Sequence, residues 1–283
     1  MLDLFTIALS IFVQAIPFLV IGTFVSTFIS PSLAPKLLRL TQKLPSIFSY
    51  PIISLYGLTL PVCECGNIPV TRNLIQSGYK PSQAITFMLA APIINPITLF
   101  TTYDAFRTTP EIFYYRLLAG LALPVSIGLL FEFKQNQSRL LSPSLLQLCQ
   151  HPHSHTKSQT FFQEFSHMLF LLLPAVFVAS AFQIFFPASL LQELTNSPTQ
   201  SIAFAMFFTA ILSVCSSVDA YIGLSLLGTF SIGAVSAFLI YGPMVDIKLL
   251  LMMRSTFSPF TLFFIFIYTT LSTFLTGLLI HLF

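Results

Sequence analysis

Residues 63–67, Cys63-Glu64-Cys65-Gly66-Asn67, place two thiols beside a carboxyl group, and Pro61 and Pro69 flank them. Thiolate sulfur is a soft ligand and carboxylate oxygen a hard one, so the set suits a thiophilic metal ion or a metalloid. Gly66 allows a positive φ or a close approach of another backbone. The alternative interpretation is that Cys63 and Cys65 are small apolar packing residues, as free cysteines often are.

A related cluster follows in the second half of the chain, where Cys215 and Asp219 each lie 152 residues after Cys63 and Asn67. Ser216 stands next to this second cysteine. The matched spacing predicts that Cys63, Cys65 and Cys215 converge, with the polar side chains around them contacting a substrate. The three cysteines are therefore candidate metal ligands.

Asn95 and Asp246 form a second matched pair, 151 residues apart, and each comes three residues after a proline. We expect both to line the same substrate site as the two clusters. For Asn95 the alternative is that its side chain only satisfies backbone groups freed by the neighbouring prolines. Asp219 and Asp246 could instead lie near helix ends at a membrane interface.

Glu64, Asp219 and Asp246 are the acidic residues that lie well inside apolar segments. An ionised side chain at the centre of a bilayer costs about 2.5–3.5 kcal/mol on insertion scales, so such residues are functional by default. Burial favours the neutral form of a carboxyl group. These three residues are therefore the candidates for coupling transport to protons.

His151, His153 and His155 form an alternating histidine tract of a kind that can bind transition metals. In a flexible loop such a tract is more often incidental, so it is a weaker metal site than the cysteines. The chain has no phosphate-binding glycine loop with a lysine, no nucleophile elbow and no HExxH pair. We therefore expect no enzyme activity and no cofactor.

The composition indicates a membrane protein, since 55% of the 283 residues are hydrophobic and only 7% are charged. Soluble domains carry roughly 25% charged residues. The formal charge of +3 is too small to indicate a nucleic-acid partner. The expected fold is an all-α, polytopic transmembrane helical bundle in the cell membrane, surrounded by the lipid bilayer, with about eight hydrophobic segments at residues 2–29, 47–78, 82–105, 112–133, 160–186, 201–227, 232–251 and 256–282.

Residues 134–160 form a polar, histidine-containing linker that divides the chain into two repeated transmembrane halves, 1–133 and 161–283. Duplicated halves are typical of secondary transporters. Segments two and six are predicted to be broken or re-entrant, because prolines and glycine crowd the middle of segment two. If both re-enter, ten basic residues lie on the linker side and two, Arg107 and Arg116, on the other, which predicts a cytoplasmic linker.

The run from Pro61 to Val70, with the later Ala-Ala-Pro92-Ile-Ile-Asn95-Pro96, resembles the UPF0718 permease family over nearly the whole chain. That family includes organoarsenical efflux permeases. The Cys-Glu-Cys-Gly motif is more similar to that of a second branch of the family, which consists of other bacterial permeases. The resemblance implies a permease, and it implies a second membrane protein as a possible partner subunit.

These observations favour a secondary permease that moves a small solute, most simply a soft metal or metalloid species, through a cavity where the two halves meet. One alternative is a non-transporting membrane subunit of a two-protein complex. The other is a membrane thiol oxidoreductase that uses Cys63 and Cys65, although Cys149 and Cys215, the remaining cysteines, lie far apart in the sequence.

Overall fold

The structure is a computed structural model, and it describes residues 2–29, 41, 45–59, 64–133, 137–143, 145–146, 157–185, 197–212, 214–216 and 218–282. These residues form helices joined by turns, with one strand-like bridge between Leu141 and Phe257. The predicted all-α class is therefore confirmed.

The helices of the first half end at the polar linker, and both α3 and α4 are too short to cross a bilayer. In chain order they are α1 (Leu2–Phe24) with the π-helical turn η1 (Val25–Ile29), α3 (Ser46–Ser54) with the 3-10 turn η2 (Leu55–Leu58), α4 (Glu64–Gln76), α5 (Pro81–Ala90), α6 (Pro96–Ala105) and α7 (Pro110–Glu132).

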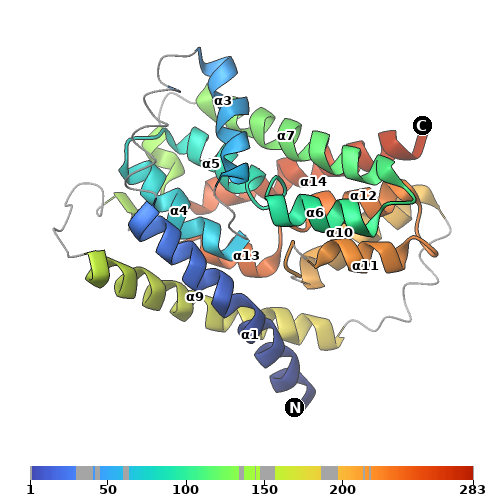
Figure 1. Cartoon of the computed structure of the whole chain (residues 1–283), viewed down its shortest axis with the longest axis horizontal. Coiled ribbons are helices and arrows are strands. Elements are labelled where there is room, and N and C mark those ends of the chain that lie inside the picture. The colour runs from blue at the N-terminus through green and yellow to red at the C-terminus, as the bar shows by residue number, and fades with distance from the viewer. Residues whose placement is uncertain are drawn as a thin grey trace.

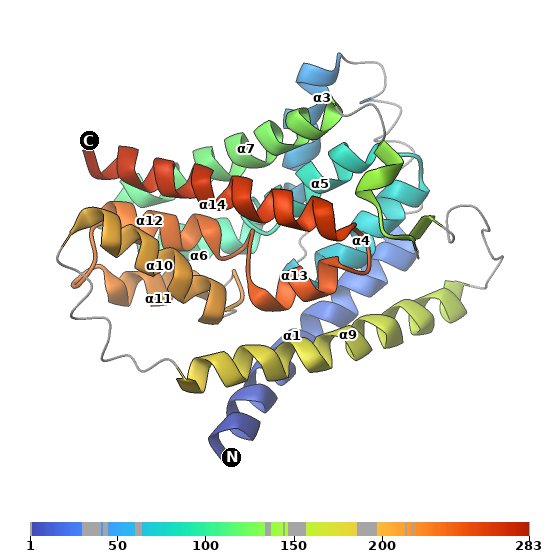
Figure 2. The ribbon, with the colours of Figure 1, turned by 180° about the vertical axis from the view of Figure 1, so that it is seen from behind.

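The second half follows η3 (Gln137–Leu140), a short turn inside the predicted linker. Its helices are α9 (Lys157–Phe185), α10 (Pro198–Leu212), α11 (Asp219–Leu226), α12 (Ile232–Tyr241), α13 (Ile247–Met253) and α14 (Pro259–Leu282). Figures 1 and 2 show α7 and α14 side by side and running in opposite directions.

Two helices of the described part of the chain, α7 and α14, are long and apolar enough to cross a membrane. With 23 and 24 residues they extend about 35 Å at 1.5 Å per residue. The shorter apolar helical stretches are Leu19–Phe28, Phe48–Leu58, Pro198–Leu212 and Ile232–Tyr241.

Segments three and seven, expected as single apolar stretches, are each divided into two short helices. The break between α5 and α6 follows from Pro92 and Pro96, which lack the amide hydrogen that a continuous helix needs. Asn95 then caps α6, because its Oδ1 accepts a hydrogen bond from Ile97 N at 3.0 Å. Asp246 caps α13 in the same way, after a turn that contains Pro243.

Close backbone contact brings α1 onto α4, and Figure 1 shows α1 and α9 crossing along one side of the molecule. A Cβ added to Gly22 would lie 2.3 Å from the Cα of Gly66, so the two helices touch backbone to backbone. The contact places the start of α4, where the Cys-Glu-Cys-Gly motif ends, directly against α1.

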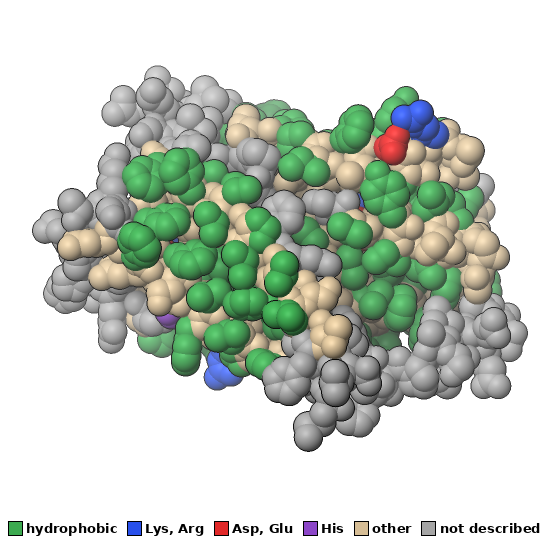
Figure 3. All heavy atoms as spheres, turned by 60° about the horizontal axis from the view of Figure 1, so that its bottom comes forward, with side chains coloured by type: hydrophobic (Ala, Val, Ile, Leu, Met, Phe, Trp, Pro, Cys, Tyr) green, Lys and Arg blue, Asp and Glu red, His purple; other side chains and the backbone are tan. Residues whose placement is uncertain are grey.

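The outer surface is apolar over a wide area. Figure 3 shows hydrophobic side chains spread across the face formed by the lower elements of Figure 1, with charged groups near its rim. Phe263 and Leu271 on α14 are 64% and 59% exposed, and Phe170 on α9 is 74% exposed. An apolar surface of this extent suits contact with lipid rather than water.

Candidate functional site

The beginning of α4 meets the second half through a side-chain hydrogen bond. Ser216 Oγ donates to Glu64 Oε2 at 3.1 Å, and both residues are buried. Glu64 and Ser216 are 152 residues apart, which is the spacing that relates the two cysteine clusters. The structure therefore brings the first-half motif and its second-half counterpart together at this point.

Cys65 directly follows Glu64 in the sequence, and Cys215 directly precedes Ser216. Both cysteines are free thiols. The Cys65 side chain is buried, 2% exposed, and Cys215 is half-buried. Cys65 lies within electrostatic range of Lys248, Glu64, Asp246 and Cys215. Within the described residues, no three His, Cys, Asp or Glu side chains are grouped as a metal site.

Asp219 is held by a buried arginine from the other half. Arg116 on α7 donates from Nη1 to Asp219 Oδ1 at 2.9 Å and from Nη2 to Oδ2 at 2.6 Å. Arg116 Nη1 also donates to Thr102 Oγ1 at 2.9 Å. The Arg116 side chain is fully buried, and Asp219 is 3% exposed. This two-pronged ion pair joins α7 and α6 to the first residue of α11.

Asp246 is also paired with a cation. Its Oδ2 lies 3.7 Å from Lys248 Nζ, and both side chains are buried. Its Oδ1 accepts a hydrogen bond from Leu249 N, which is the helix cap described above. Asp246 thus lies at the start of α13 and is buried in the protein interior.

Asn67 and Asn95 are buried and have structural partners. Asn67 Nδ2 donates to Met88 O at 2.8 Å and so ties α4 to α5, while Asn67 Oδ1 is buried with no hydrogen-bond partner among the described atoms. Asn95 caps α6, which is the backbone-satisfying role considered for it. Gly66 serves the contact with α1, so the structure gives it a packing role.

The charges of this cluster do not cancel. Asp219 has Arg116 and Asp246 has Lys248 within ion-pair distance, whereas Glu64 makes no ion pair within 4.0 Å in the described part of the chain. Glu64 interacts through space with the negative charges of Asp219 and Asp246 and with the positive charge of Lys248. The cluster consists of three acidic and two basic side chains, namely Glu64, Asp219, Asp246, Arg116 and Lys248. When all five are ionised, it carries one surplus negative charge.

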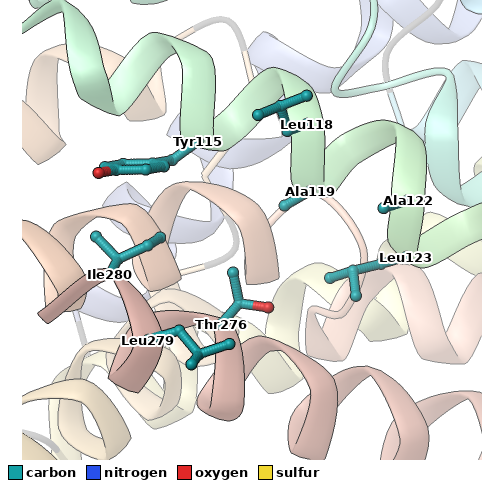
Figure 4. Close-up of a pocket in the computed structure, with 8 residues that line it drawn as sticks. All are labelled: Tyr115, Leu118, Ala119, Ala122, Leu123, Thr276, Leu279 and Ile280. Atoms are coloured by element: carbon teal, nitrogen blue, oxygen red, sulfur yellow. The ribbon is translucent and has the colours of Figure 1, made fainter. Parts of the chain in front are cut away.

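Four predicted ligands lie outside the described residues, namely Cys63, His151, His153 and His155. Two pockets of the described part of the chain lie elsewhere. One of about 530 Å³ lies between α7 and α14, lined mostly by apolar side chains such as Leu118, Ala119 and Leu279 (Figure 4). Another of about 690 Å³ lies on α9 beside His167.

The sequence analysis missed Arg116 and Lys248 because it counted both as loop charges. Arg72, counted in the same way, is buried and lies 3.4 Å from Glu164 Oε2. The ten-to-two charge balance therefore included three basic residues that form ion pairs inside the protein. Their positions within apolar segments 47–78, 112–133 and 232–251 were the signal, since a charge inside a membrane segment needs a partner.

Comparison with known proteins finds relatives that are described as permeases or as UPF0718 proteins. A family described as "Predicted permease" matches residues 1–282. A Bacillus subtilis protein named "UPF0718 protein YcgR" is 36% identical over 94% of this chain and 93% of its own. A Streptococcus mutans protein named "Putative two-component membrane permease complex subunit" is 35% identical over 90% of this chain and 87% of its own. No solved structure matches.

Proposed function

Since this chain belongs to the family of predicted permeases, we propose that it is a secondary transporter whose substrate path passes the contact between Glu64 and Ser216. The main support for this proposal is that the contact joins the two halves of the chain through two buried polar side chains. In secondary transporters, substrate and coupling-ion sites lie at the interface of the repeats, where helices are broken.

The two halves are proposed to be structural repeats of inverted orientation. The broken pair α5 and α6 corresponds to α12 and α13, and α5 and α12 have the same length at an offset of 151 residues. Asn95 and Asp246 cap the second helix of each pair. The opposite directions of α7 and α14 support the inversion. The eight predicted segments and the re-entrant course of segments two and six belong to the same proposal.

Glu64 is proposed as the group that binds the coupling proton. Asp219 and Asp246 each lie within ion-pair distance of a buried cation, so a proton on either would weaken a buried ion pair. A proton on Glu64 instead removes the surplus negative charge of the cluster. The pairing of Asp219 and Asp246 with cations supports Glu64 among the three candidates named from the sequence.

The proposed substrate is a thiophilic metal ion or metalloid, with Cys65 and Cys215 as ligands and Cys63 completing the set. Cysteines ligate as thiolates, so binding of such a cargo releases thiol protons. Binding in transit needs fewer fixed ligands than a resident metal site. The lack of a grouped metal site among the described residues fits a transient cargo better than a structural metal.

Elemental analysis of cells that express the protein tests the substrate. We expect one thiophilic element in a panel of metals and metalloids to change its accumulation, and the change to disappear in Cys65→Ser but not in the control Cys149→Ser. In Glu64→Gln the accumulation should lose its dependence on a pH gradient, while Glu111→Gln, at an exposed position on α7, keeps it. A change that persists in Cys65→Ser refutes thiol ligation. No change for any element refutes the metal or metalloid substrate.

A second membrane subunit is proposed from the name of the Streptococcus mutans relative. The protein is to be expressed alone in a host that lacks a related permease, and also together with a candidate second membrane subunit. Accumulation that requires both chains supports a two-component complex. Full activity of this chain alone rules out an obligatory partner.

A further inference from the structure

The first residues of the predicted linker are built into the fold. Residues Gln137–Ser142, here called the strap, begin with η3 and reach both halves of the chain. On the first-half side, Ser82 N donates to Gln137 Oε1 at 3.2 Å, and Gln137 Nε2 donates to Phe131 O at 2.8 Å. The strap is thereby fixed to the beginning of α5 and the end of α7.

On the second-half side, the strap pairs with the turn between α13 and α14. Ser142 N donates to Thr256 O at 3.0 Å, and Ser258 N donates to Leu140 O at 2.9 Å. Two side chains reinforce this pairing. Ser142 Oγ donates to Ser255 O at 2.8 Å, and Thr261 Oγ1 donates to Leu140 O at 3.0 Å.

The strap is also anchored by apolar side chains. Leu140 and Leu141 are 1% and 7% exposed and belong to the main hydrophobic core. Leu145, three residues after the strap, is fully buried. The polar composition of this stretch predicts a mobile linker. Its leucines nevertheless pack against both halves. Figure 2 shows this yellow-green segment beside α5 and the start of α14.

The first-half anchor is itself rigid. Glu132, the last residue of α7, accepts hydrogen bonds from Tyr50 on α3, from Ser82 and from Lys80. This network ties α3, α5 and α7 together next to Gln137. The second-half attachment, in contrast, depends on a short two-stranded pairing and on the hydroxyl groups of Ser142 and Thr261. The strap makes four hydrogen bonds to the second half and two to the first, but it follows the end of α7 within five residues of Glu132 and so stays tethered to the first half by the chain itself.

We propose that the strap is a latch that holds the linker-side end of the two halves together and closes the path to Cys65 from that side. The inference rests on the proposed transport function, because alternating access requires the halves to move against each other. A segment bonded to both halves must detach from one of them. The strap detaches from the α13–α14 turn and stays with the Glu132 network.

The test uses Cys65 as the reporter of access. In a background of Cys63→Ser, Cys149→Ser and Cys215→Ser, the rate at which a membrane-impermeant maleimide modifies Cys65 is measured from each side of membrane vesicles. The latch variant is Ser142→Ala/Thr261→Val. The matched control is Thr276→Val, since Thr276 Oγ1 donates within its own helix to Ser272 O at 2.8 Å.

We expect labelling from the linker side to rise about tenfold or more in the latch variant, because two hydrogen bonds of ordinary strength are lost. Labelling from the opposite side and labelling of Thr276→Val should stay at the parent rate. An unchanged linker-side rate, or an equal rise on both sides, overturns the latch. Labelling needs no transported substrate, so the result can be interpreted even if the proposed substrate is wrong.

Discussion

Removal of the Arg116 guanidinium tests whether the ion pair with Asp219 is the buried connection between the halves. Arg116→Met keeps most of the side-chain volume but leaves the Asp219 carboxylate, 3% exposed, without its two hydrogen bonds. Breaking a buried pair by removing one partner costs about 3–5 kcal/mol, because the remaining charge is uncompensated. Thr102 Oγ1 loses a donor as well.

The matched variant removes both charges. Arg116→Met/Asp219→Leu leaves no buried ion, and exchanges of this kind are often neutral or stabilising. We therefore expect the double variant to recover most of the free energy of unfolding that Arg116→Met loses. The difference defines a coupling energy of about 3 kcal/mol, well above the approximately 0.5 kcal/mol found for independent sites.

The free energy of unfolding is to be measured by reversible denaturation in detergent micelles for the parent, both single variants and the double variant. Thr98→Val, which replaces a buried hydroxyl with no hydrogen-bond partner among the described atoms, serves as a nearby control on α6. A coupling energy below about 0.5 kcal/mol would refute the conclusion that this pair connects the halves.

Three further substitutions test the packing and the caps by the same measurement. Gly22→Ala should lose about 2 kcal/mol because its Cβ meets the backbone of α4, whereas Gly228→Ala, with nothing within 4 Å, should change little; equal effects would refute the close contact. Asn95→Ala should cost about 1 kcal/mol by removing the cap of α6, and no loss would contradict the capping role. Glu132→Ala should cost about 2 kcal/mol, and Lys80→Ala, whose side chain is 52% exposed, less than about 1 kcal/mol; the reverse order would refute the network.

The recurring apolar segments predicted the all-α class, because hydrophobicity is a local property of the sequence. The matched spacing of the two clusters was visible before the structure, and the hydrogen bond between Glu64 and Ser216 obeys it. The division of segments three and seven was not predicted, although Pro92, Pro96 and Pro243 were in view. Hydropathy averages over such a break, since the turn between α5 and α6 is as apolar as the helices.

The sequence could not predict which buried basic residue pairs with which carboxylate. A charge count treats every lysine and arginine as solvent-exposed, and so it placed Arg116 and Lys248 in loops. Which carboxylate each of them meets depends on how α7 packs near α11 and how α13 begins, and no local pattern encodes this. The strap was missed for a related reason, because its leucines are few within a polar stretch.

The charge balance of the site leads to a prediction about proton release. A cluster with one surplus negative charge is neutralised by one proton, or by a singly charged cargo. Each cysteine that ligates a divalent thiophilic ion gives up its thiol proton. If Glu64 is protonated in the resting protein, binding of such an ion displaces one proton from Glu64 and one from each ligating cysteine. Titration of the purified protein with Cd²⁺ in a weakly buffered indicator solution measures this number directly. We expect Glu64→Gln and Cys65→Ser each to lower the number of released protons by about one, whereas Glu111→Gln leaves it at the parent value. An unchanged number in Glu64→Gln would show that Glu64 is ionised before the ion arrives, and would remove it as the coupling group.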